Sequence, residues 1–356
     1  MNVIFWDRDF TSLLTPLPVI YKVKPYSHSV IGGPKKAEIF VKGSELDLWE
    51  LAEYARRPVQ IFSDKGDPVW WGFVAEIKLN VGLWSVGINI DSMANYVGVA
   101  YEDDADGGLP KKTDWAEGAD SIAEYGRREI LFTSSGSNET HALAARDKYL
   151  AEKKYPIPVI NPREKGENSA TLFCRGWFDT LAWRYYANAG VNSVDTASQI
   201  SAMAISCGEF IEGIDLETAS GISTLETRDG NGNGLYEITE LLKMGTVNYR
   251  RMLCEVTIGR RLRIYEEPVI SNKSNLILKD GSLRDPYDTV IRKDTCPVGI
   301  WTRLKDIVPG SVDTTKLADP TIMFIDESEY ISDEDRLNLI PRGFIDPFQI
   351  GRPRDG

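Results

Sequence analysis

The chain has 356 residues, 42% of them hydrophobic, so it is long enough for two or three domains that each bury a core. Its 53 acidic and 41 basic side chains give a net charge of −12, which disfavours a surface that grips nucleic-acid phosphates. No apolar run reaches the roughly 18 residues of a membrane span, and Met1–Asp9 lacks the features of a signal peptide. We therefore expect a soluble protein made in the cytoplasm.

Two further features of the composition limit the function. The acidic charge suits a tube wall that must not hold a passing polymer, and it equally suits plain solubility. The four cysteines are 33 to 47 residues apart, without the close pairs of a zinc site or the density of a disulfide scaffold. We expect them to be buried as small apolar residues: Cys174, Cys207, Cys254 and Cys296.

Residues 1–105 are predicted to form an antiparallel β-barrel with one short helix. Apolar and polar residues alternate in 37–43, 69–79 and 84–91, as in half-buried strands, and 80–82 is a plausible hairpin turn. The alternation in the second run places Trp71 inward and Trp70 outward. Ser44 caps a helix that Pro58 ends.

Residues 106–169 are predicted to connect two β domains. A polar stretch at 102–112 is typical of a loop, and one helix is expected from about Ser137 to Glu152. Three prolines between 156 and 162 then mark a stiff boundary near residue 165.

Residues 170–270 are predicted to form a second β-barrel. The aromatic run 172–186 is interpreted as strands, and Asp195 caps a helix that ends at Gly208. Another helix ends at Gly245 and leads into a hairpin that turns at Gly259 and Arg260. The order of helix and then hairpin matches the first half and suggests an internal repeat. Residues 271–356 are rich in turn residues, and we expect an extended segment that wraps a neighbour or packs along the barrels.

One loop matches the twelve-position calcium pattern of an EF-hand. The oxygen ligands of a structural Ca²⁺ would be Asp229, Asn231, Asn233, Glu237 and Glu240. The preceding residues 221–228 do not favour the helix that an EF-hand needs. The same residues are also typical of a turn rich in glycine and asparagine, in which Asn233 caps the following helix. We favour this second interpretation.

The sequence contains no recognisable catalytic set. The two histidines, His28 and His141, are interpreted as surface or interface residues, and no site residue for catalysis or a cofactor is assigned. Three arginine pairs either grip a neighbour's carboxylates or face water: 127–128, 250–251 and 260–261. Nine tryptophans are many for a soluble monomer, and an outward-facing Trp70 would need a partner subunit to cover it.

The order of short motifs over roughly residues 35–270 resembles the tail-tip or baseplate hub proteins of tailed bacteriophages. The match begins with a helix. It continues, in chain order, through the segments 57–61, 69–74, 91–101, 120–129, 195–200, 221–224, 241–246 and 262–268. The resemblance implies two related barrels in each chain and a homotrimer that closes a pseudo-sixfold ring. Such a ring continues the tail tube, carries the central spike or fibre, and opens to let DNA pass without specific binding.

The resemblance also implies partners and a location. The partners would be other tail proteins, such as the distal tail protein, the tape measure and the central spike or fibre, and the location would be the tail tip of the virion. We expect a structural protein and not an enzyme. The alternatives are a carbohydrate-binding or carbohydrate-acting β-protein with a calcium loop and, within the virion, a hexameric distal tail protein.

Overall fold

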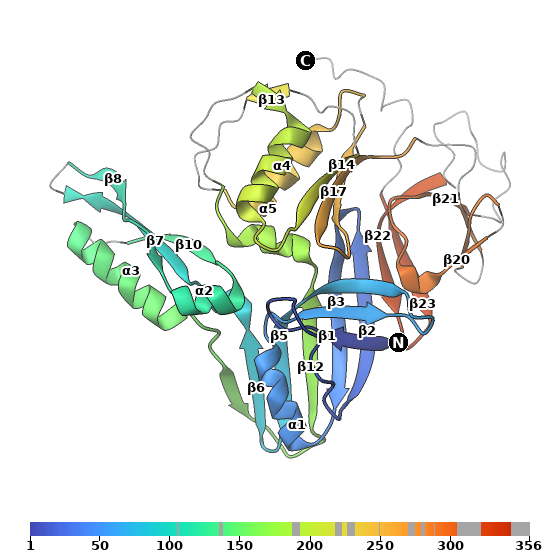
Figure 1. Ribbon diagram of the computed structural model, residues 1–356, viewed down its shortest axis with the longest axis horizontal. Coiled ribbons are helices and arrows are strands. Elements are labelled where there is room, and N and C mark those ends of the chain that lie inside the picture. Colours follow the sequence, from blue (N-terminus) through green and yellow to red (C-terminus); the bar gives the residue numbers. More distant parts are fainter. Residues whose placement is uncertain are drawn as a thin grey trace.

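The computed structural model describes residues 1–104, 107–134, 138–186, 193–217, 223–225, 232–248, 250–269, 275–278, 282–287, 289–304 and 322–342. Strands outnumber helices, which confirms a mainly β fold with inserted helices (Figure 1). The α-helices are α1 (Glu45–Glu50), α2 (Ala119–Tyr125), α3 (Glu139–Lys153), α4 (Thr196–Cys207) and α5 (Gly234–Met244). Short 3-10 helices span Leu51–Tyr54, Ile90–Ser92, Trp177–Trp183 and Lys293–Thr295.

The first half of the chain builds a curled antiparallel sheet in the order β1–β4–β5–β12–β3–β2. The rings of Phe5 on β1 and Tyr21 on β2 lie 5.6 Å apart, so the sheet curls back on itself as the predicted first barrel requires. Helix α1 lies against β5, with Leu48 fully buried, and Ser44 caps it as predicted. The strands are β1 (Asn2–Phe5), β2 (Ile20–Ser29), β3 (Ile31–Lys42), β4 (Pro58–Phe62), β5 (Pro68–Val81) and β12 (Ser169–Arg175).

Two hairpins extend this sheet at its margins. The far half of β5 pairs with β6, and β6 pairs with β11, which is the last described strand on that side. On the other side β22 pairs with β2 and β23 pairs with β22, so the described end of the chain packs along the barrel as a hairpin. The strands are β6 (Trp84–Asn89), β11 (Val159–Pro162), β22 (Ile322–Ile331) and β23 (Arg336–Pro341).

The aromatic run 172–186 differs from its prediction. Its first residues complete β12, which lies between β3 and β5 in the first sheet, and Trp177–Trp183 form a 3-10 helix. The strand ends just before Gly176, where a Cβ atom would lie 1.7 Å from the carbonyl oxygen of Pro34. The aromatic residues that follow pack as a cluster around Phe210 and not on alternate faces of a sheet.

The second half forms a mixed sheet that is continuous with the first. β14 pairs in parallel with β17, β17 pairs antiparallel with β16, and β16 pairs with the first residues of β3. Helices α4 and α5 begin at caps Asp195 and Asn233, as predicted. The order of helix and then hairpin recurs here, but a second closed barrel stays a prediction. The strands are β13 (Ser193–Asp195), β14 (Gly213–Glu217), β15 (Ser223–Leu225), β16 (Met252–Val256) and β17 (Arg261–Glu266).

The connecting region is a small lobe that projects from the barrel (Figure 1). It contains two helices, α2 and α3, where one was predicted, and α3 is capped by Asn138. Its strands are β7 (Tyr96–Asp103), β8 (Leu109–Lys112), β9 (Ala116–Glu117) and β10 (Glu129–Thr133). A further small sheet near the end of the described chain contains β18 (Asn275–Ile277), β19 (Leu283–Arg284), β20 (Val290–Ile291) and β21 (Trp301–Leu304).

A buried guanidinium joins the three parts. Arg56 is 2% exposed, and it donates hydrogen bonds to the carbonyl oxygens of Arg8 at 2.6 Å and Glu124 at 2.7 Å. Its guanidinium carbon lies 5.0 Å from the ring centre of Phe210 in the second half. Burial lowers the pKa of Arg56 to about 10, which leaves the group charged at neutral pH. One cation therefore holds the barrel, the lobe and the second half together.

We predict that Arg56→Met destabilises the protein by about 2 to 4 kcal/mol, because two carbonyl groups lose a charged donor inside the fold. The free energy of unfolding in urea measures this loss. Arg336→Met is the matched control, since Arg336 is exposed and pairs only at the surface with Glu334, and it should change stability by less than about 1 kcal/mol. Equal effects of the two variants would contradict the role of Arg56.

Candidate assembly surface and aromatic pocket

An open strand edge lies beside an exposed apolar surface. In the described part of the chain β11 pairs with β6 alone, and all four of its side chains are exposed. Val159 is 61% exposed and Ile160 is 60% exposed. Ile160 lies opposite the buried Val86, so the apolar face of β6 continues onto β11 without cover. We define the edge patch as the exposed apolar residues of this region: Leu83, Trp84, Ile157, Val159 and Ile160.

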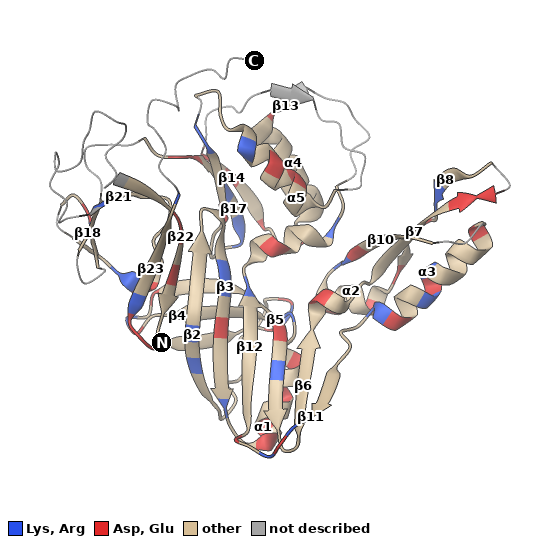
Figure 2. Cartoon of the chain, turned by 180° about the vertical axis from the view of Figure 1, so that it is seen from behind, with Lys and Arg blue, Asp and Glu red and all other residues tan. Residues whose placement is uncertain are grey.

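The edge patch lacks the charges that normally protect an open edge. Neither β6 nor β11 contains a Lys, Arg, Asp or Glu, and both are uniformly tan in Figure 2. Soluble monomers usually place charges on an open edge so that other chains do not pair with it. Several other marginal strands do carry charges: β8 carries Lys111 and Lys112, β14 carries Asp215 and Glu217, and β23 carries Arg336. The β11 edge is therefore well suited to pair with another chain.

The exposed tryptophans are not the predicted ones. Trp70 is fully buried, whereas Trp71 is partly exposed and donates its indole N–H to the carbonyl oxygen of Val256 at 2.9 Å. The ladder between β12 and β5 shifts register near Ala75, and this irregularity reverses the alternation that placed Trp70 outward. Trp84 in the edge patch and Trp49 on α1 are the indoles that a partner would cover, with 49% and 39% of their surface exposed.

The three arginine pairs bind within the chain. Arg127 pairs with Glu129, and Arg128 contacts Asp91 at 3.5 Å and the ring of Trp183. The other four bind acidic residues of neighbouring elements: Arg250 with Glu266, Arg251 with Asp326, Arg260 with Glu212, and Arg261 with Asp215. Each of these arginines therefore binds an acidic residue of its own chain, and Arg261 is also exposed to water, as one of the two interpretations expected. Apart from Glu129, the acids that neutralise them are distant in sequence, so periodicity does not indicate them.

The calcium loop is described only in its second half. Asp229 and Asn231 lie outside the described residues. Asn233 accepts a hydrogen bond from the backbone N–H of Tyr236 at 2.9 Å and caps α5, as the turn interpretation requires. Glu237 is buried in the first turn of α5, and Glu240 forms an ion pair with Lys243. Over the described residues, no three Asp, Glu, His or Cys side chains are grouped to hold a metal ion.

The two histidines have different environments. His141 is exposed on α3, as expected of a surface residue. His28 is buried, and its Nε2 lies 2.9 Å from the carbonyl oxygen of Val69, so the interpretation of this residue as a surface group is wrong. Burial lowers its pKa to about 4, because a charged imidazolium would lose its hydration there.

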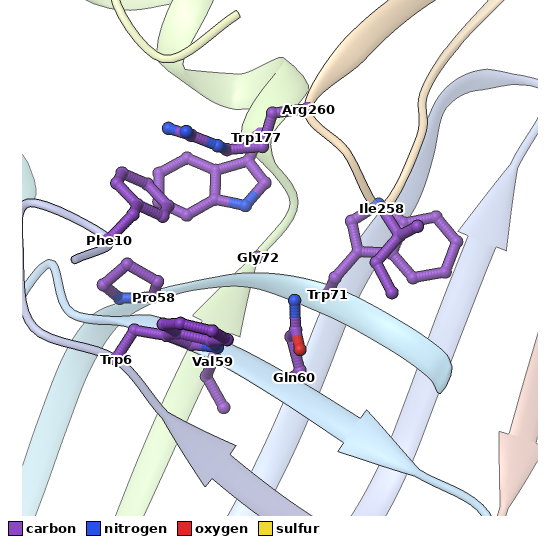
Figure 3. A pocket seen from close by; sticks show the side chains of 10 residues that line it. All are labelled: Trp6, Phe10, Pro58, Val59, Gln60, Trp71, Gly72, Trp177, Ile258 and Arg260. Atoms are coloured by element: carbon purple, nitrogen blue, oxygen red, sulfur yellow. The ribbon is translucent and has the colours of Figure 1, made fainter. Parts of the chain in front are cut away.

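An aromatic pocket lies where the first barrel meets the second half (Figure 3). It has a volume of about 120 Å³. Trp6 and Phe10 come from the N-terminal segment, Gln60 from β4, and Arg260 from the turn between β16 and β17. We call this the aromatic pocket, and its lining is Trp6, Phe10, Pro58, Val59, Gln60, Trp71, Gly72, Trp177, Ile258 and Arg260. Sequence periodicity does not indicate it, because the lining combines five separate parts of the chain.

Two remaining expectations concern burial and membranes. All four cysteines are free and buried, as expected of small apolar residues. No helix in the described ranges is long and apolar enough to cross a membrane.

The geometry defines a mainly β protein with an unprotected sheet edge, and known structures offer a comparison. No protein-family model and no curated protein matches the sequence. Three solved structures are similar over 98% of this chain. The 43 kDa tail protein of prophage MuSo2 from Shewanella oneidensis is 8% identical, with a TM-score of 0.45 and 97% of that chain covered.

The two other structures also come from tail-related proteins. The tail protein from Neisseria meningitidis MC58 is 7% identical, with a TM-score of 0.47 and 98% of that chain covered. The E. coli c3393 protein is a type VI secretion component described as similar to the T4 tail proteins gp27 and gp5. It is 6% identical, with a TM-score of 0.46 and 78% of that chain covered.

The buried His28 predicts a pH dependence of stability. The folded state binds fewer protons than the unfolded state between the folded pKa of about 4 and the ordinary value of 6.5, so stability is complete above pH 6.5 and falls as the pH drops through this window. We expect a loss of about 2 kcal/mol between pH 7 and pH 5, where most carboxylates are still ionised.

Denaturant unfolding at several pH values measures this slope. His28→Gln keeps an N–H donor for the carbonyl oxygen of Val69 but does not titrate, so most of the loss should disappear. His141→Gln is the control and should retain it. An unchanged slope in His28→Gln would show that other groups cause the acid sensitivity.

Proposed function

We propose that the chain is a structural subunit of a bacteriophage tail tip, a hub protein that closes into a ring with further copies of itself. The observation that carries the proposal is the β11 edge, which is open, uncharged and apolar. A monomer that exposes such an edge tends to associate, whereas a ring uses it as a contact between subunits. The ring is a homotrimer that continues the tail tube.

A closed ring needs two different contact surfaces on each copy, because identical subunits then join head to tail. The edge patch supplies one. Three exposed apolar residues of the second half supply part of the other: Ile205 on α4, and Tyr236 and Met244 on α5. In Figure 2, β11 lies near the bottom of the view and the two helices lie near the top. That arrangement supports a contact that continues from copy to copy.

The charge of the chain supports a passive channel. With a net charge of −12 the ring would repel DNA phosphates, so the polymer would pass without being held. The arginines of the three pairs do not counter this, since each contacts an acidic residue of its own chain. The ring anchors a central spike or fibre and contacts the distal tail and tape-measure proteins.

The oligomeric state tests the proposal. Light scattering on the protein as it elutes from a size-exclusion column should show a trimer. Ile160→Lys should raise the dissociation constant of the assembly at least tenfold, because a lysine side chain buried at the paired edge would lose its hydration without gaining an acidic partner. Ile340→Lys is the matched control, since Ile340 is 50% exposed on the marginal strand β23, which carries a charge. It should leave the assembly intact.

Three outcomes would change the conclusion. A wild-type chain that stays monomeric at micromolar concentration would contradict the ring. A hexamer would favour a distal tail protein. A trimer that Ile340→Lys disrupts and Ile160→Lys does not would place the contact on the opposite margin of the sheet.

A further inference from the structure

Strand β11 turns only part of its backbone toward the open edge. The N–H of Arg163, which directly follows the strand, donates to the carbonyl oxygen of Leu83 at 2.9 Å, and β11 continues this antiparallel pairing with β6. In an antiparallel pair, residues that exchange hydrogen bonds alternate with residues whose N–H and C=O groups point away from the partner strand. The first and third residues of β11 therefore bond to β6, whereas the second and fourth, Ile160 and Pro162, direct their backbone groups to the open side.

Prolines remove most of the N–H groups that this edge could donate. Pro162 has no N–H, and neither has Pro158, two residues before Ile160. Over residues 158–162 the open side therefore offers one N–H, that of Ile160, together with the carbonyl oxygens of Ile160 and Pro162. A strand added to a sheet needs a donor at every second residue of the edge, because its own carbonyl groups are otherwise buried without partners. The edge can form a single bridge at Ile160 but no continuous ladder.

The edge strand β8 of the lobe combines a proline with charges. The N–H of Thr113, which directly follows β8, donates to the carbonyl oxygen of Val99 at 2.9 Å, so Pro110 and Lys112 direct their backbone groups away from β7. Proline and lysine both discourage the addition of another strand. β11 has the prolines without the charges. It therefore blocks strand addition while it leaves an apolar surface open for a different kind of contact.

We propose that Pro158 and Pro162 select a helical surface of a neighbouring copy as the partner of the β11 edge. The inference rests on the proposed ring and names the surface that meets the edge patch in it. A helix uses its backbone N–H and C=O groups internally, so it covers apolar side chains without adding a strand. An edge strand of a neighbour would instead bury its own carbonyl groups against the two prolines.

Helices α4 and α5 present such a surface. The start of α5 lies beside the end of α4, because a Cβ atom on Gly234 would lie 2.6 Å from the Cβ of Cys207. Ile205 and Tyr236 near these ends are 74% and 58% exposed, and α4 contains no charged residue. Ile205 matches the apolar side chains of the edge patch, and the phenolic O–H of Tyr236 can donate to the outward carbonyl oxygen of Pro162.

Restoring the missing N–H groups tests the role of the prolines. Pro158→Val combined with Pro162→Val should let strands add to the edge, so light scattering should show assemblies of about twice the mass of the wild-type trimer or more. Both prolines are exposed, and the thermal melting temperature checks that the variant folds. Pro110→Val is the matched control, because it restores an outward N–H on the edge that lysines protect, and it should keep the wild-type mass.

A disulfide cross-link tests the helical partner. Ile160→Cys combined with Ile205→Cys, oxidised with copper phenanthroline, should give covalent trimers on a denaturing gel without reductant. Ile160→Cys combined with Ile340→Cys is the control and should run as a monomer. The four native cysteines are buried and should not react. Cross-linking through position 340 and not through position 205 would assign the edge to a neighbouring strand and overturn the inference.

The outcomes separate this inference from the ring. A wild-type trimer whose mass and dissociation constant stay unchanged when both prolines are replaced by valine would overturn the inference and leave the ring intact. A wild-type monomer would contradict the ring and, with it, the helical partner of the edge.

Discussion

The three parts of the molecule depend on one buried cation. Arg56 follows the short helix of the barrel, yet its two hydrogen bonds end on Arg8 and on Glu124 of the lobe, and its guanidinium stacks on Phe210. Burial of such a group is unfavourable unless contacts offset it, and the two hydrogen bonds and the ring of Phe210 come from all three parts, so they favour the three parts being in place together. The adjoining aromatic cluster of Phe10, Trp177 and Phe210 lies in the same junction. The aromatic pocket is a consequence of that junction.

The local elements could be predicted from the sequence because short-range rules determine them. Caps at Ser44, Asp195 and Asn233 begin the expected helices, since each side chain accepts a hydrogen bond from a backbone N–H three residues on. The hairpin of β16 and β17 follows from its alternation and turn residues. The mainly β class follows from the same signals.

The features that could not be predicted depend on residues distant in sequence. A register irregularity in the pairing of β5 with β12 reversed the expected orientation of Trp70, and nothing local to 69–79 indicates it. The arginine pairs form ion pairs with acidic residues up to 75 residues away in the sequence. The edge patch combines β6 with β11, about 70 residues later, so periodicity shows each strand but not their common apolar face. The aromatic pocket could not be predicted for the same reason, because its lining residues come from segments that are distant in sequence.

Strand β3 belongs to both halves of the chain. Its residues 36–42 pair with β12, while Ile31 and Gly32 at its start pair with β16. Gly32 and Gly33 have φ angles of +98° and +77°, and they turn the strand from one sheet into the other. A side chain at Gly32 would lie 2.8 Å from the ring of Phe178. Tension applied to one sheet would therefore pass along the covalent backbone of β3 into the other.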